Sequence, residues 1–264
     1  MPRRSLVFVH AHPDDEALLT AGTMAKAVQA GHRVTLVVAT DGAAGLADAA
    51  IAGELSQIRR AELEQSARAL GIDDVVCLGY ADSGLHAEVP EGFAHVASFS
   101  VARRIADVCN DVSADVLVGY DPSGGYGHPD HLKVHRCVRT SLALCTRTPS
   151  LFEATLPREP IAGAVRLAQR LRLTPAGFDA AEFSQAWTPR REITHRVNVR
   201  PYLEAKDAAL RAHASQASAD GTVRTLAVLT RLPRAVQAPL LGTEYYVSVP
   251  WSPRIAKSTA SGAS

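Results

Sequence analysis

The feature that most constrains the fold is an apolar run at residues 7–9 that ends in the segment HAHPDDE at residues 10–16. The run is typical of a buried strand, and the pattern after it is typical of an amphipathic helix. Two histidines and three acids so close together are costly to bury unless a cation or a proton-transfer reaction uses them. Because open α/β sheets bind ligands at the carboxyl ends of their strands, we expect an active site here.

The rest of the chain predicts alternating strands and helices. We expect strands at 5–9, 33–39, 75–78, 116–119, 151–155, 194–199 and 243–249, and helices at 13–30, 54–70, 93–109, 130–145 and 201–213. The initial strand–helix–strand order is a βαβ unit, which implies parallel pairing. The fold class is therefore α/β, with a Rossmann-like, mostly parallel sheet that has helices on both faces. The stretch from 157 to 188 is broken by prolines and is interpreted as an excursion over the active site.

Composition limits the classes of function. Hydrophobic residues make up 47% of the 264, and the formal charge is +1, which provides no electrostatic footprint for nucleic acid. Four scattered cysteines without a CxxC pair are typical of a reducing compartment. No apolar run has the length of a signal-peptide core or a membrane span. We expect a single domain over residues 1–255, a flexible C-terminal tail over 256–264, a cytoplasmic location and no membrane partner.

A second polar cluster, with two histidines and an acid, lies at residues 125–131 after the fourth expected strand. Both clusters would then lie at the carboxyl edge of one sheet and could converge. His12, Asp15 and one histidine of the second cluster would form a set suited to Zn²⁺ or Fe²⁺, with a position open for water. The remaining acid would act as a general base, and the remaining histidine as an acid or oxyanion stabiliser. Each cluster alone could be an acidic helix start; two together favour a metal site.

These two motifs, AHPDDE at 11–16 and GHPDH at 127–131, resemble those of the PIG-L/LmbE superfamily of zinc-dependent N-deacetylases. That superfamily includes N-acetylglucosaminyl-inositol deacetylases and mycothiol conjugate amidases. Weaker similarities lie at 40–45, 59–71 and 206–216. The resemblance implies an LmbE-like fold. It also implies a metal site whose ligands are His12, Asp15 and His131.

The resemblance further assigns roles to the other polar residues of the two motifs. Asp14 would be the general base. His128 would polarise the amide carbonyl and hold the oxyanion. Asp130 would orient His128 or a metal-ligating histidine. Tyr126 resembles a mobile tyrosine that assists at the oxyanion, with a packed loop aromatic as the alternative.

Two residues outside the motifs resemble side chains that grip sugar hydroxyls. These are Arg59 and Asp82, although Arg59 could also pair with Glu62 on a helix surface. His10 precedes His12 by two residues, roughly 6–7 Å along a strand, and is expected outside the metal sphere.

Three more polar residues receive no catalytic role. Glu16 is expected to hydrogen-bond locally. His135 is expected to be a satisfied supporting or surface residue, and His213 to be structural or at the rim of the site.

The resemblance implies an enzyme that hydrolyses an N-acyl group, above all N-acetyl, on an N-acetylglucosamine-like sugar or conjugate. Water activated by the metal would lose a proton to Asp14 and attack the carbonyl. A mycothiol-conjugate-type amidase and a non-catalytic metal- or sugar-binding protein are the alternatives; a pure binder needs no unliganded base. A nucleotide-binding Rossmann protein is disfavoured, because no G-x-G-x-x-G follows the first strand. The expected partner is the small-molecule substrate, and a homo-oligomer is left open.

Overall fold

The computed structural model describes residues 2–42, 55–85, 87, 89–171, 185–217 and 233–250. Its strands are β1 (Ser5–His10), β2 (Arg33–Thr40), β3 (Asp74–Tyr80), β4 (Val116–Tyr120), β5 (Ser150–Thr155), β6 (His195–Asn198) and β7 (Thr243–Val249). Its α-helices are α1 (Asp15–Leu19), α2 (Ala21–Gln29), α3 (Leu55–Leu70), α4 (Ser98–Asp111), α5 (Gly124–Gly127), α6 (Pro129–Ser141), α7 (Arg158–Arg170), α9 (Leu203–Ala212), α10 (Ala214–Ala217) and α12 (Arg234–Leu241). Short 3₁₀ helices are η2 (Phe93–His95), η3 (Arg190–Glu192) and η4 (Arg200–Tyr202).

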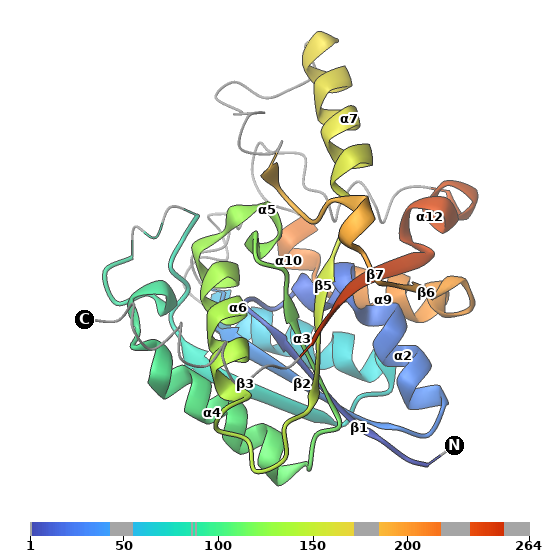
Figure 1. Cartoon of the computed structure of the whole chain (residues 1–264). Helices are drawn as coiled ribbons and strands as arrows, with labels where there is room; N and C mark the ends of the chain where they lie inside the picture. The colour runs from blue at the N-terminus through green and yellow to red at the C-terminus, as the bar shows by residue number, and fades with distance from the viewer. Residues whose placement is uncertain are drawn as a thin grey trace.

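The strands of this part of the chain form one sheet in the order β3-β2-β1-β4-β5-β7-β6. The first five in this order pair in parallel, whereas β7 runs antiparallel to both β5 and β6. Helices lie on both faces of the sheet (Figure 1). The predicted α/β class with a mostly parallel sheet is therefore confirmed.

Alternate residues of β1 enter two different cores, because the strand is covered on both faces. Val7 and Val9 belong to a core that includes Ile105 of α4, and Phe8 belongs to one that includes Met24 of α2 and Leu63 of α3. All three β1 residues are at most 1% exposed. Burial on both sides explains why the strand is a continuous apolar run rather than an alternating one.

The sheet order creates a topological switch point between β1 and β4. From β1 the chain proceeds to β2 and β3 on one side, and then returns to β4 on the other side of β1. The segments that leave β1 and β4 therefore lie side by side at the carboxyl edge, where open α/β sheets bind ligands. These segments hold the two polar clusters.

The predicted helix at 13–30 is two helices, α1 and α2, that meet at Thr20. Thr20 leaves the helical conformation, with φ of −136°. Its buried hydroxyl lies 2.8 Å from Nε2 of His10 and donates to the carbonyl of Glu16 at 3.4 Å. Such side-chain hydrogen bonds compete with the helix backbone. The single helix expected at 93–109 likewise divides, into η2 and α4.

The proline-broken stretch after β5 contains a full helix. α7 projects away from the sheet (Figure 1), and Ala162 is its one buried residue. The chain then returns through Trp187, which packs into the core against Gly125. The tail predicted at 256–264 lies outside the described residues. Within the described part, no helix combines the length and apolar character needed to cross a bilayer.

Candidate active site

Three side-chain atoms from the two polar clusters form a nearly equilateral triangle. Nδ1 of His12 and Nε2 of His131 each lie 3.3 Å from Oδ2 of Asp15. The two ring nitrogens also lie 3.3 Å from each other. Ligands about 2.0–2.1 Å from a tetrahedral zinc are separated by about 3.3–3.4 Å. The predicted ligands therefore fit one metal ion and leave a fourth position open.

The opposite nitrogen of each ring is held by the protein. Nδ1 of His131 lies 3.1 Å from the carbonyl oxygen of Gly124, and Nε2 of His12 lies 3.2 Å from Oδ2 of Asp130. A proton on each of these nitrogens leaves a lone pair on the nitrogen that faces the triangle. Asp130 thus contacts His12, and its orientation of a metal-ligating histidine, one of the two possibilities that the sequence left open, stays a prediction.

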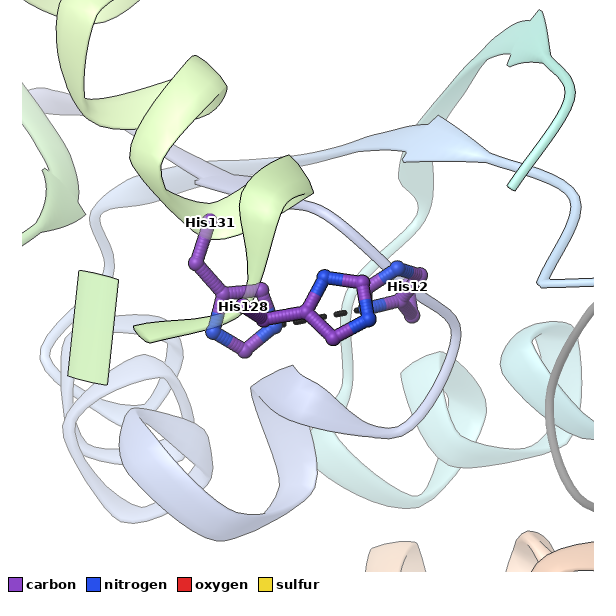
Figure 2. Close-up of side chains that lie close together, drawn as sticks. All are labelled: His12, His128 and His131. Atoms are coloured by element: carbon purple, nitrogen blue, oxygen red, sulfur yellow. Dashed lines mark hydrogen bonds between the residues drawn. The ribbon is translucent and has the colours of Figure 1, made fainter. Parts of the chain in front are cut away.

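His12 is common to two other groups of potential ligands. Ligand atoms of His12, His128 and His131 lie within 4.8 Å of one another, as do those of His12, Asp82 and Asp130. Figure 2 shows the three imidazoles side by side, two from the start of α6 and one from the turn after β1. We favour the triangle with Asp15, because its three separations are equal at 3.3 Å and it leaves Asp130 as a partner of His12.

Negative charge accumulates around His12. Burial lowers the pKa of His12, but hydrogen bonds with Asp130, Asp15 and Asp82 outweigh burial and raise it well above 6.5. Burial raises the pKa of Asp82, yet the hydrogen bond and charge of His12 bring it down to about 2. These carboxylates therefore favour a positive charge at this point. A divalent cation would provide it.

Tyr120, which the sequence reasoning missed, contacts two of the predicted ligands. Its hydroxyl donates to Oδ2 of Asp15 at 2.6 Å and accepts from the amide of Ala11 at 3.0 Å. Its ring stacks on His131 with centroids 4.3 Å apart. The one available signal was its position as the last residue of a buried strand that precedes the second cluster.

His128 caps the helix that carries His131. Its Nδ1 accepts the amide hydrogen of Asp130 at 3.2 Å. Burial and the positive charges of His12 and His131 lower the pKa of His128 to about 4. A neutral ring that accepts at Nδ1 carries its proton on Nε2. His128 can therefore donate a hydrogen bond without being charged.

Asp14 has a strained backbone and a charged neighbour. Its φ of 137° is rare for a residue other than glycine. Nη2 of Arg59 lies 3.3 Å from Oδ2 of Asp14 and donates to the carbonyl of Pro13 at 2.6 Å. Burial raises the pKa of Asp14, Arg59 lowers it and Asp15 raises it, so that the carboxyl ends above its usual 3.8.

Arg59 is buried rather than on a helix surface. The guanidinium also donates to the carbonyl of Gly42, where a Cβ atom would meet the Arg59 Cζ at 2.5 Å. The alternative of a surface pair with Glu62 is wrong, because Glu62 is turned inward and accepts two hydrogen bonds from Ser215. Sugar binding by Arg59 stays a prediction, and the structure adds contact with Asp14.

Asp82 and Tyr126 border the same centre. Oδ1 of Asp82 lies 3.5 Å from Nε2 of His12 and accepts from the amide of Gly84. Tyr126 is 39% exposed, with its ring centroid 5.1 Å from that of His131 and 6.0 Å from that of His128. Their substrate contacts stay predictions.

Three further histidines that the sequence analysis considered, His10, His135 and His213, lie outside the triangle. His10 contacts Thr20, and His135 contacts the carbonyl of Tyr120 at 2.9 Å. His213 is fully buried, which favours the structural role over the position at the rim. It lies 2.7 Å from Glu16, which also makes the expected local hydrogen bond, with the amide of Asp14.

Asp130→Asn is expected to weaken zinc binding by about 10- to 100-fold, the range for loss of a group that orients a ligand. The asparagine keeps the shape of the side chain but loses the charge that faces Nε2 of His12. Competitive zinc titration measures the change. Asp74→Asn, which alters an exposed carboxylate paired with Arg33, is the control. Equal zinc affinity in the two variants would contradict the role of Asp130.

Comparison with known proteins identifies the family of this chain. Residues 7–142 match the family described as PIG-L, GlcNAc-PI de-N-acetylase. A relative from Acidothermus cellulolyticus, named 1D-myo-inositol 2-acetamido-2-deoxy-alpha-D-glucopyranoside deacetylase, is 35% identical over 263 residues, covering 92% of this chain and 88% of its own. The chain belongs to the PIG-L family. The resemblance carried by its two motifs is confirmed.

Solved structures extend the likeness to the whole fold. N,N'-diacetylchitobiose deacetylase from Pyrococcus horikoshii has a TM-score of 0.61 at 22% identity, covering 95% of this PIG-L chain and 84% of its own. GalB, the 4-carboxy-2-hydroxymuconate hydratase of Pseudomonas putida, has a TM-score of 0.62 at 17% identity, with coverage of 94% and 97%. A deacetylase and a hydratase share this fold, so the fold alone does not determine the reaction.

Proposed function

We propose that this chain is a zinc-dependent N-deacetylase that removes acetyl from an N-acetylglucosamine unit joined to inositol or a similar group. The observation that carries the proposal is the triangle of His12, Asp15 and His131 donor atoms, with Asp14 next in sequence and outside it. The named activity of the Acidothermus relative supports the substrate class. Fe²⁺ accepts the same ligands and is the alternative metal.

The metal, held by His12, Asp15 and His131, would supply Lewis acidity that polarises the amide carbonyl and acidifies a water. Asp14 accepts the proton of that water as oxygen attacks the acetyl carbon. It then returns the proton to the departing nitrogen, so that the C–N bond breaks and acetate and a free amine result. The raised pKa of Asp14 makes its carboxylate a stronger base than an ordinary aspartate.

His128 would stabilise the charge that develops on the former carbonyl oxygen. The hydrogen bond from the Asp130 amide fixes Nδ1 as an acceptor and directs the ring proton to Nε2. A neutral donor that is already oriented needs no reorganisation as the oxyanion forms. Tyr126 would assist; its partly exposed ring, with its centroid 6.0 Å from that of His128, supports this role.

His128→Ala is expected to lower kcat by about 10²- to 10³-fold, the cost of losing an oxyanion donor. His128→Gln should recover part of the rate, since its amide N–H can replace Nε2–H. Steady-state kinetics on both variants, with metal content measured in parallel, provide the check. If alanine and wild type share one kcat at equal metal content, His128 does not serve the oxyanion.

Two other functions are the alternatives to this one. A mycothiol-conjugate-type amidase would use the same residues on a larger amide, and a binding protein would hold metal or sugar without turnover. Asp14 disfavours the binding protein, since a site that only binds has no use for an unliganded, strained acid beside its ligands.

The test is amine release by the zinc-loaded protein from three groups of compounds: N-acetylglucosaminyl-inositol, simple N-acetylated sugars and larger thiol-conjugate amides. We expect release of acetate and amine in equal amounts, fastest for the inositol conjugate. Faster cleavage of the larger amides would support the amidase. Bound metal without amine release from any compound would favour the binding protein.

A further inference from the structure

The backbone of Asp14 requires a support. At φ 137° and ψ −26° it occupies a region that non-glycine residues rarely adopt. Such conformations persist only where the surrounding structure enforces them, and they concentrate at functional sites. The amide of Asp14 points to one particular side chain: it donates to Oε2 of Glu16 at 2.9 Å.

Glu16 is itself fixed from two distant parts of the chain. Its other oxygen, Oε1, accepts from the Ser66 hydroxyl at 2.6 Å and lies 2.7 Å from Nε2 of His213. Glu16, Ser66 and His213 are all fully buried. Ser66 belongs to α3, and His213 immediately follows α9. Both oxygens of the buried Glu16 carboxylate are thus used. Oε2 accepts from the amide of Asp14, and Oε1 is bound by Ser66 and His213.

We propose that Glu16, His213 and Ser66 form a positioning unit that holds Asp14 in its catalytic conformation. The inference rests on the proposed role of Asp14 as general base. His213 and Ser66 fix the Glu16 carboxylate, and Glu16 holds the Asp14 amide. The carboxylate of Asp14 is then aimed by contacts that begin far along the sequence. None of the three belongs to the triangle of predicted ligands, and Glu16 acts through Asp14, so each is a positioning residue.

The unit explains why the end of α9 is joined to the turn after β1. A merely structural ion pair could connect α9 to any point of α1. The pair of His213 and Glu16 instead connects α9 to Asp14, the residue before α1, through the hydrogen bond between Glu16 and the Asp14 amide. The side chain of Asp14 accepts and returns the proton. Misplacement of a reacting group by about 1 Å can cost about 100-fold in rate. Loss of the unit should therefore lower kcat and leave KM and metal content unchanged.

The test uses His213→Leu, which removes the donor, and His213→Gln, whose amide N–H can replace Nε2–H. His195→Leu, at an exposed position of β6, is the matched control. We expect kcat to fall by about 10- to 100-fold in His213→Leu and to recover in His213→Gln. KM and bound zinc should match the wild type in every variant. Equal kcat for His213→Leu and His195→Leu would overturn the proposal.

A double-mutant cycle distinguishes positioning from general damage. In an Asp14→Asn background, His213→Leu should cause no further loss, because the group that it positions is already gone. An equal loss in both backgrounds would indicate a structural role and overturn the proposal. Full activity of Asp14→Asn alone would instead contradict the proposed function, so the two failures are distinguishable.

Ser66→Ala keeps the proposal testable if His213→Leu does not fold. Hydrogen exchange of the Asp14 amide, followed by NMR, adds a readout that is independent of activity. We expect a protected amide in the wild type and faster exchange in Ser66→Ala, with a smaller loss of kcat than in His213→Leu. Wild-type exchange and wild-type kcat in Ser66→Ala would contradict the positioning unit.

Discussion

Asp14→Asn is expected to lower kcat by about 10³- to 10⁴-fold, the upper part of the range for general acid–base catalysis. The asparagine fills the same space but cannot accept the proton of the attacking water. Because Arg59 also donates to two carbonyls, its guanidinium keeps partners in the variant. Steady-state kinetics with parallel measurement of zinc and of the melting temperature separate loss of the base from loss of the fold.

The pH dependence of wild-type activity is a second test of Asp14 as the general base. Its pKa is raised above 3.8, and the ionised form is the base. Activity should therefore rise with pH through that raised pKa, and kcat/KM should show an acid limb above the pH of an ordinary aspartate. An Asp14→Asn variant with wild-type kcat and the same acid limb would exclude Asp14 as the base.

His131→Ala is expected to abolish metal binding and activity together. Loss of a ligand removes one corner of the triangle, whereas loss of a supporting group costs only about 10- to 100-fold in affinity. The effect on zinc affinity should therefore exceed that of Asp130→Asn. Metal analysis after dialysis against a fixed free zinc concentration measures it, together with amine release.

Thermal unfolding provides the control for His131→Ala. A ligand that binds the folded state alone raises the melting temperature. Zinc should therefore raise the melting temperature of the wild type and of an exposed-site variant, His195→Ala, but not that of His131→Ala. Zinc stabilisation of His131→Ala equal to that of the wild type would show that His131 is not a ligand.

The meeting of the two polar clusters was predictable from the sequence. Each cluster follows a buried apolar run, and parallel strands end at one edge of a sheet. That His12 and His131 face one another depends on β1 and β4 being neighbours in the sheet, an order that the sequence did not predict. The identity of the ligands came from the resemblance rather than from spacing.

The side chains that support the site residues could not be predicted from the sequence in the same way. Tyr120 received no role, and it lies one position beyond the strand expected at 116–119. Its hydroxyl contacts residues about a hundred positions earlier, which no local pattern predicts. Glu16 makes the local hydrogen bond that was expected, with the amide of Asp14, but its contact with His213, 197 positions away, was not predicted. Sequence periodicity identifies which face of an element is buried. It does not identify which buried polar groups form hydrogen bonds with one another.

The break between α1 and α2 at Thr20 is a second kind of feature that the sequence did not predict. The apolar pattern of residues 13–30 continues through Thr20, so that periodicity predicts one helix. The structure ends α1 there because the threonine hydroxyl bonds within the turn and contacts His10. A single side-chain contact with the first strand thus overrides a pattern that is correct on either side of it.

The most direct test of the account measures bound metal and acetate release on the same samples of wild-type protein. Chelator-treated protein should retain its fold and release no acetate from N-acetylglucosaminyl-inositol. Activity should then return in proportion to added Zn²⁺ or Fe²⁺ and reach a plateau at one ion per chain. Full deacetylation by metal-free protein would contradict the claim that His12, Asp15 and His131 hold a catalytic ion.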